Sequence, residues 1–107
     1  MKNTDKKIQE MQLLEQNLQR LLLQKQAFQM ELSETQSALK EIENSGEEVF
    51  KIIGQLMIKT DKSKMKQELL NKEKILNLRT KAIEKQESSL TEQLDKLREE
   101  MIKTINK

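Results

Sequence analysis

The sequence predicts a mainly α-helical protein: a long antiparallel two-helix coiled coil with a short β-hairpin at its bend. Charged residues make up 36% of the 107 residues and aromatic residues 2%, which is typical of long helices or of disorder. Apolar residues recur at heptad spacing in both halves of the chain, and this periodicity favours helices over disorder. Between the halves, one short window concentrates apolar and β-branched residues, which favours strands there.

The first predicted helix covers about residues 4–44. Two heptad series, offset by three residues, run along it, and only Lys25 and Thr35 among their members are polar. A pair of apolar series at this spacing forms the seam of a coiled coil. Directly after the helix, Gly46 is expected to adopt the left-handed conformation that ends many helices. The two series are Met11, Leu18, Lys25, Leu32 and Leu39, and Leu14, Leu21, Phe28, Thr35 and Ile42.

The second predicted helix covers about residues 62–106, with Asp61 or Thr60 as its N-cap. Apolar residues again recur every seven positions, but the companion series is polar until Leu94 and Met101. The seam of this helix is therefore poorer and becomes fully apolar only towards its C-terminal end. Its apolar series is Leu69, Leu76, Ile83, Leu90 and Leu97.

The two seams match if the chain folds back at its middle. Residues whose numbers add up to about 108 then lie opposite one another, as in an antiparallel pair of helices. Met11 faces Leu97 in this register, and Lys25 faces Ile83, so most polar seam positions meet an apolar partner. We therefore expect residues 1–107 to form a single domain.

The window between the helices, about residues 48–60, predicts a β-hairpin. Its strands are expected at about residues 49–53 and 55–59, with a turn at Gly54. The large apolar residues of this window are Val49, Phe50, Ile52, Ile53, Leu56, Met57 and Ile58.

Both faces of the predicted hairpin are apolar. Because side chains alternate along a strand, Phe50 and Ile52 share one face, while Val49 and Ile53 share the other. A lone hairpin cannot bury both faces, and burying all of these side chains is worth roughly 10–20 kcal/mol. We predict that hairpins of several subunits assemble into a shared sheet or barrel; the alternative is a hydrophobic loop that folds onto its own helices.

The composition offers no chemistry for catalysis. The chain has no histidine and no cysteine, which removes the imidazole base and the commonest metal ligands. Its two glycines do not form a phosphate-binding loop. A formal net charge of +2 without a basic face argues against nucleic-acid binding, and no apolar stretch is long enough to span a membrane. We expect no enzyme, no cofactor, no metal site and no catalytic residue, and a cytoplasmic location.

Apolar and methionine side chains also gather at the opposite end of the coil from the hairpin, where both termini lie. Flexible methionine and aliphatic side chains at an open end adapt to varied apolar surfaces. We predict a binding role for this end, and the alternative is that these residues only complete the seam. The candidates are Ile8, Met11, Leu97, Met101, Ile102 and Ile105.

Three stretches of the chain resemble the prefoldin family of cochaperones. They are ETQSALKEI at residues 34–42, EVFKIIGQLMIKT at residues 48–60 and KQELLNKEKILNLRTKAIEKQE at residues 66–87. The last two are the most specific, because similarity within a coiled coil alone is common. The chain is similar to the beta-type subunits, especially archaeal ones, which carry one hairpin where alpha-type subunits carry two.

The resemblance implies a function as well as an architecture. In this family two alpha-type and four beta-type subunits join through their hairpins into a double β-barrel, from which six coiled coils extend. The coil ends hold unfolded polypeptide clients without ATP and transfer them to a group II chaperonin. The rival hypothesis is a structural coiled-coil adaptor that docks one fixed partner through its hairpin. The implied assembly residues are Val49, Phe50, Ile52, Ile53, Gly54, Leu56, Met57 and Ile58, and the end residues given above would bind clients.

Overall fold

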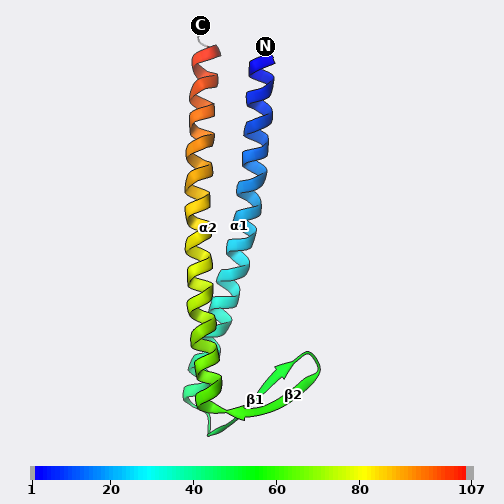
Figure 1. Ribbon diagram of the computed structural model, residues 1–107, viewed down its shortest axis with the longest axis vertical. Coiled ribbons are helices and arrows are strands. Elements are labelled where there is room, and N and C mark those ends of the chain that lie inside the picture. The colour runs from blue at the N-terminus through cyan, green and yellow to red at the C-terminus, as the bar shows by residue number, and fades with distance from the viewer. Residues whose placement is uncertain (1, 106–107) are drawn as a thin grey trace. The chain divides into compact units, whose positions relative to one another are not determined.

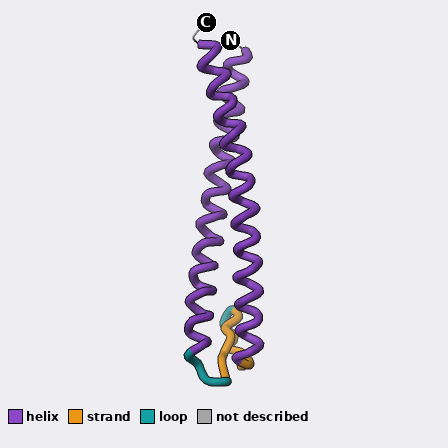
Figure 2. The backbone as a smooth tube through the Cα atoms, turned by 90° about the vertical axis from the view of Figure 1, so that its left-hand side faces the viewer, coloured by secondary structure: helices purple, strands orange, loops and turns teal. Residues whose placement is uncertain are grey.

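The computed structural model describes residues 2–105, with the backbone alone for residues 2 and 3. Helix α1 (Lys2–Glu43) leads into strands β1 (Glu48–Ile53) and β2 (Leu56–Asp61), and helix α2 (Lys62–Ile105) follows directly (Figure 1). Figure 2 shows these helices in purple, the hairpin in orange and the loop after α1 in teal. The predicted fold class, two long helices around a short antiparallel hairpin, is confirmed. The predicted end of the second helix at residue 106 lies outside the described residues.

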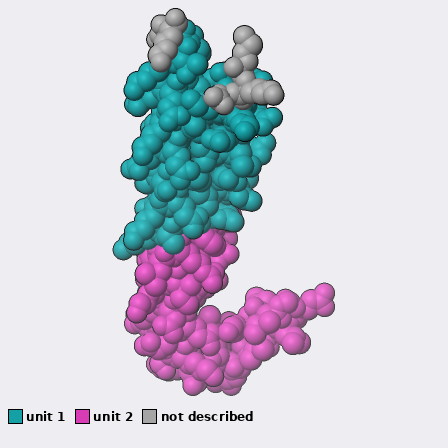
Figure 3. Space-filling view, turned by 45° about the horizontal axis from the view of Figure 1, so that its top comes forward, with its two compact units in different colours: residues 1–26, 81–107 teal, residues 27–80 magenta. Residues whose placement is uncertain are grey.

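The chain divides into two compact units, which Figure 3 shows in different colours. The terminal unit comprises residues 1–26 and 81–107, and the root unit comprises residues 27–80 with the hairpin. Each unit contains one segment of α1 and one segment of α2. The core is described below for each unit separately.

The core of the terminal unit follows the predicted heptads. Leu21, Ile83 and Leu94 are buried, and the other seam positions of this unit are half-buried. The polar seam residue Lys25 was predicted to face Ile83. Its Nζ lies 3.5 Å from Oε1 of Glu87, a second polar seam residue, so the two charged side chains lie next to each other. An ion pair in a partly buried seam compensates each charge for lost water.

The core of the root unit contains Ile42, Leu69, Leu76 and one polar residue, Thr35. The Thr35 side chain is only 3% exposed, and its hydroxyl donates a hydrogen bond to the Glu31 carbonyl at 2.7 Å. Because the hydroxyl is satisfied within its own helix, threonine can occupy a buried seam position at little cost. The predicted seam is thus confirmed, including its polar exception.

Helix α1 does not end as the sequence suggested. Gly46 does not take a positive φ, so the predicted left-handed cap at this residue is wrong. The amides of Asn44 and Ser45 instead bond back three residues, to Glu41 and Ile42, at 3.1 and 3.2 Å. The Ser45 hydroxyl donates a further bond to the Ile42 carbonyl at 2.8 Å. These bonds satisfy carbonyls that the last helical turn leaves without partners.

The hairpin pairs Ile53 with Leu56, so Gly54 and Gln55 form a two-residue turn. Gly54 has a φ of 60°, and Gln55 does not have a positive φ. This combination is a type II′ turn, which requires glycine at its first position. The predicted turn at Gly54 is confirmed, and the second strand begins one residue later than predicted because the turn takes two residues.

Candidate functional site in the hairpin and at the helix ends

The hairpin exposes apolar side chains on both of its faces. Cross-strand pairing places Ile52 beside Met57 on one face, and Ile53 beside Leu56 on the other. In the space-filling view, the arm that projects from the root unit is this hairpin (Figure 3). Six large side chains of the hairpin are between 43% and 69% exposed, so the chain does not bury them on its own helices. They are Phe50, Ile52, Ile53, Leu56, Met57 and Ile58.

One ion pair ties the hairpin to α2, and a second joins its two strands. Lys51 Nζ lies 2.8 Å from Oε2 of Glu68 on α2 and ties β1 to that helix. The hydrogen bond from Lys51 also holds the pKa of the Glu68 carboxyl below its usual value. Lys59 Nζ lies 2.8 Å from Oε1 of Glu48, which links the two strands. Both pairs lie near the base of the hairpin, and its apolar tip carries neither of them.

An open groove lies where the hairpin meets the helices of the root unit. Its volume is about 460 Å³, and two hairpin residues of the predicted assembly set line it, the half-buried Val49 and the exposed Phe50. Both exposed hairpin residues and buried core residues of the helices line this groove. Its lining residues are Ala38, Glu41, Ile42, Ser45, Val49, Phe50, Met65 and Leu69.

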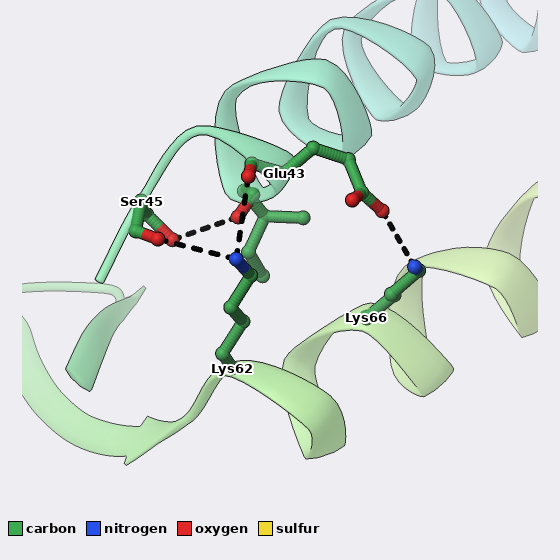
Figure 4. Close-up of polar contacts among 5 residues, drawn as sticks. Glu43, Ser45, Lys62 and Lys66 are labelled. Carbon is green, nitrogen blue, oxygen red and sulfur yellow. Dashed lines mark hydrogen bonds and ion pairs between the residues drawn. The ribbon is translucent and has the colours of Figure 1, made fainter. Parts of the chain in front are cut away.

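The root of the hairpin is fastened by two lysines at the start of α2 (Figure 4). Lys62 Nζ donates hydrogen bonds to the carbonyl oxygens of Glu43, at 3.3 Å, and Ser45, at 3.2 Å. Lys66 pairs with the Glu43 carboxylate, and this hydrogen bond holds the pKa of the Glu43 carboxyl below its usual value. The last carbonyls of α1 are therefore capped by a cation from α2.

The sequence interpretation missed this capping arrangement. Asp61 or Thr60 was expected to cap α2 by accepting a hydrogen bond from a backbone amide, yet neither side chain takes part in any of the described hydrogen bonds. The available signal was the row of lysines in the first turn of α2, with no acid among them. A lysine is disfavoured at a helix N-terminus, so a partner elsewhere is the expected compensation.

The predicted binding residues at the helix ends fall into two groups. Ile8, Ile102 and Ile105 are 39%, 58% and 72% exposed and lie off the seam. Met11, Leu97 and Met101 are half-buried within the seam. Three of the predicted residues thus complete the seam of the terminal unit, and the other three expose apolar surface there.

The terminal unit also carries an apolar groove that the sequence interpretation missed. The groove has a volume of about 370 Å³ and is lined by Leu13, which is 58% exposed, beside the seam residues Leu14 and Leu97. Glu10, Gln93 and Lys96 complete its rim. Leu13 lies outside both heptad series, and a leucine at such a position is the signal that would have indicated this groove.

No cluster of three or more His, Cys, Asp or Glu side chains suited to a metal ion occurs between residues 2 and 105. Across that same range, neither helix has the length and apolar character needed to span a membrane.

Comparison with known proteins relates this chain to one family. Residues 5–107 match the family described as Prefoldin subunit. The prefoldin subunit beta of Thermococcus onnurineus is 44% identical over 85 residues, which cover 78% of this chain and 73% of that protein. The prefoldin subunit beta of Pyrobaculum aerophilum is 40% identical over 92 residues, covering 84% and 73%. A crystal structure of the prefoldin beta subunit from Thermococcus strain KS-1 superposes with a TM-score of 0.87 at 35% identity, covering 95% of this chain and 91% of that one.

Proposed function

The chain belongs to the prefoldin subunit family, and from that premise we propose that it is a beta-type subunit of a hexameric chaperone. Its hairpin joins those of two alpha-type and three further beta-type subunits in a double β-barrel. The helix ends of the assembled complex hold unfolded polypeptides without ATP and transfer them to a group II chaperonin in the cytoplasm. No catalysis and no cofactor is involved.

The observation that carries this proposal is the exposed hairpin. Its six large apolar side chains are 43–69% exposed in the single chain, and burying that exposed part is worth roughly 5–11 kcal/mol as an upper estimate. That is comparable to the stability of a whole domain. The outer edges of a two-stranded sheet also leave backbone groups unpaired, and closure into a barrel pairs them. Assembly therefore satisfies both the side chains and the backbone of the hairpin.

Client holding is supported by the terminal unit. Ile102 and Ile105 are exposed at the end of α2, and the groove beside Leu13 and Leu97 offers a mostly apolar depression. Each such contact is weak because it is small and open to water. Several coil ends on one client act together through their high effective concentration, which gives firm but reversible holding.

The test is suppression of aggregation by the assembled complex. The chain is combined with an alpha-type subunit, and light scattering follows several unrelated denatured proteins in the absence of nucleotide. We expect aggregation of all of them to be suppressed. Suppression of a single client, or binding of one fixed protein, would instead support the rival coiled-coil adaptor. Transfer is measured separately, as the regain of client activity when a group II chaperonin and ATP are added.

A further inference from the structure

In the root unit, helix α2 carries a second line of apolar positions that is turned away from its seam. The seam residue Leu76 is 2% exposed, whereas Ile75 and Leu78 are 48% and 59% exposed. One residue turns a helix by about 100° and two residues by about 200°, so neither of these side chains points into the seam. Asn71, Ile75 and Leu78 follow one another at intervals of four and three residues, the spacing of a heptad seam. This short line therefore has the form of a second seam, which the described helices leave exposed.

Basic residues flank this line on both sides. Lys72 and Arg79 each directly follow a residue of the line, and Lys74 directly precedes one. These are the positions that flank the seam of a coiled coil, where charges decide which helices can pair. All three basic side chains are exposed. The line and its flanks together form the basic face of α2, which comprises Asn71, Lys72, Lys74, Ile75, Leu78 and Arg79.

The positive charge of the basic face is not neutralised by the part of the chain that the structure describes. Among residues 4–105, Lys72, Lys74 and Arg79 have no ion pair within 4.0 Å. The nearest acids along the helix are engaged elsewhere, because Glu68 pairs with a lysine of the hairpin at 2.8 Å and Glu73 lies half-buried in the seam. The face therefore attracts an acidic partner.

The side chains of the basic face suit a protein helix rather than a nucleic acid or a membrane. Surfaces that bind single-stranded nucleic acid combine basic residues with aromatic side chains for stacking, and α2, from Lys62 to Ile105, contains no aromatic residue. A helix that lies in a membrane surface needs a broad apolar face, and the basic face offers only Ile75 and Leu78 as large apolar side chains. A narrow apolar line between basic flanks instead matches a helix that carries its own apolar line between acidic flanks.

We propose that the basic face of α2 docks an acidic amphipathic helix of a partner protein. Aliphatic side chains of that helix cover Ile75 and Leu78, and its flanking glutamates or aspartates pair with Lys72, Lys74 and Arg79. The line is little more than one heptad long, so the contact is small, weak and rapidly exchanging. The face lies on a single chain, and the proposal therefore goes beyond the proposed function without depending on hexamer formation.

Binding of a designed peptide tests this docking. The probe is a fluorescein-labelled helix of about three heptads, with leucine at its two seam positions and glutamate at both flanking positions. Fluorescence anisotropy measures the dissociation constant of the peptide from the full chain at low and at physiological salt. We expect saturable binding that weakens as salt is added, because exposed charges are screened. Peptides with lysine in place of glutamate, or with serine in place of leucine, should bind at least about tenfold more weakly.

Substitutions in the chain locate the binding site of the peptide. Lys74→Glu combined with Arg79→Glu replaces two attractions by repulsions and should weaken binding about tenfold or more. Leu78→Ser removes apolar surface and should weaken binding about fivefold. The matched control is Arg20→Glu combined with Lys40→Glu, which changes the net charge equally at exposed positions of α1. This control should change the affinity less than about threefold, because its charges lie away from the basic face.

Three outcomes would overturn the proposal. Unchanged affinity after the exchange at Lys74 and Arg79, or an equal loss in the control, would show that the peptide does not bind at the basic face. Tighter binding of single-stranded RNA, or of vesicles with anionic lipids, through the same two residues would assign the face to another class of partner. Self-association of the chain that these substitutions abolish, measured by sedimentation, would make a second copy the occupant.

Assembly is measured on the same samples, so that the docking and the proposed function are judged separately. Circular dichroism of every variant should show unchanged helix content, because all of the substituted side chains are exposed. A chain that binds the peptide but forms no hexamer with an alpha-type subunit would contradict the proposed function and leave the docking intact. A hexamer that does not bind the peptide would contradict the docking alone.

Discussion

Replacing Ile53 by aspartate should abolish assembly while leaving the two helices folded. Ile53 is 51% exposed in the single chain, so about half of its apolar surface is available for burial between subunits. Full burial of such a side chain is worth about 1.5–3 kcal/mol, and the available half about 0.8–1.5 kcal/mol. A carboxylate without a partner in the same apolar interface adds several kcal/mol. The lost burial and the unpaired charge together cost about 4 kcal/mol, which lowers the affinity of each subunit contact roughly a thousandfold.

The same substitution should barely change the fold of the chain. The buried residues of the root unit lie on the helices, and Ile53 lies on the hairpin beside Leu56, which is 66% exposed. Circular dichroism should therefore show unchanged helix content, while sedimentation with an alpha-type subunit should show no hexamer. The matched control is Leu22→Asp, which places the same charge on an exposed leucine of α1. An Ile53→Asp chain that still forms the hexamer would refute the assignment of the hairpin as the assembly element.

Three further predictions follow from the same structure. Met101→Ser combined with Ile105→Ser should reduce suppression of client aggregation severalfold without affecting assembly, as light scattering and native mass spectrometry would show. Leu76→Ala, at a position only 2% exposed, should lower the free energy of unfolding by about 2–5 kcal/mol in urea titration. Lys66 and Lys51 hold the pKa values of Glu43 and Glu68 below the ordinary value. Their stabilisation is therefore present above the ordinary glutamate pKa and lost as the pH falls through the lowered values, a dependence that Glu43→Gln with Glu68→Gln should flatten.

Controls for these predictions use exposed positions of the same helices. Leu22→Ser should leave aggregation suppression unchanged, because this residue lies away from the helix ends. Leu78→Ala should change the free energy of unfolding of the single chain much less than Leu76→Ala, because Leu78 is 59% exposed. Equal losses at both positions would contradict the assignment of the seam. In the pH experiment, an undiminished acid dependence in the double glutamine variant would contradict the role given to the two carboxylates.

The coiled coil was predictable because its signal is periodic and repeated. Each seam residue belongs to a series, so burial of Leu21, Leu76 or Leu94 follows from several neighbours at once. The turn at Gly54 was predictable for a different reason: a type II′ turn admits almost no other residue at its first position. Burial of the polar Thr35 at a seam position has a simple reason as well, since its hydroxyl donates a hydrogen bond to a carbonyl of its own helix.

The features that the sequence did not reveal depend on individual side-chain contacts, which leave no repeated pattern in the sequence. Gly46 was expected to end α1, but Ser45 and Lys62 satisfy the final carbonyls, which leaves no need for a left-handed residue. Lys25 reaches Glu87 along the seam because a long side chain is not confined to the residue directly opposite. Leu13 belongs to neither heptad series, so the groove that it lines became visible only in the structure.

The most direct test of the whole account is native mass spectrometry of the chain with and without an alpha-type subunit. The exposed hairpin of the single chain requires burial by other subunits, so we expect a complex of two alpha and four beta subunits in the mixture. A chain that remains monomeric in every mixture, with its hairpin apolar residues still exposed to water, would contradict the account.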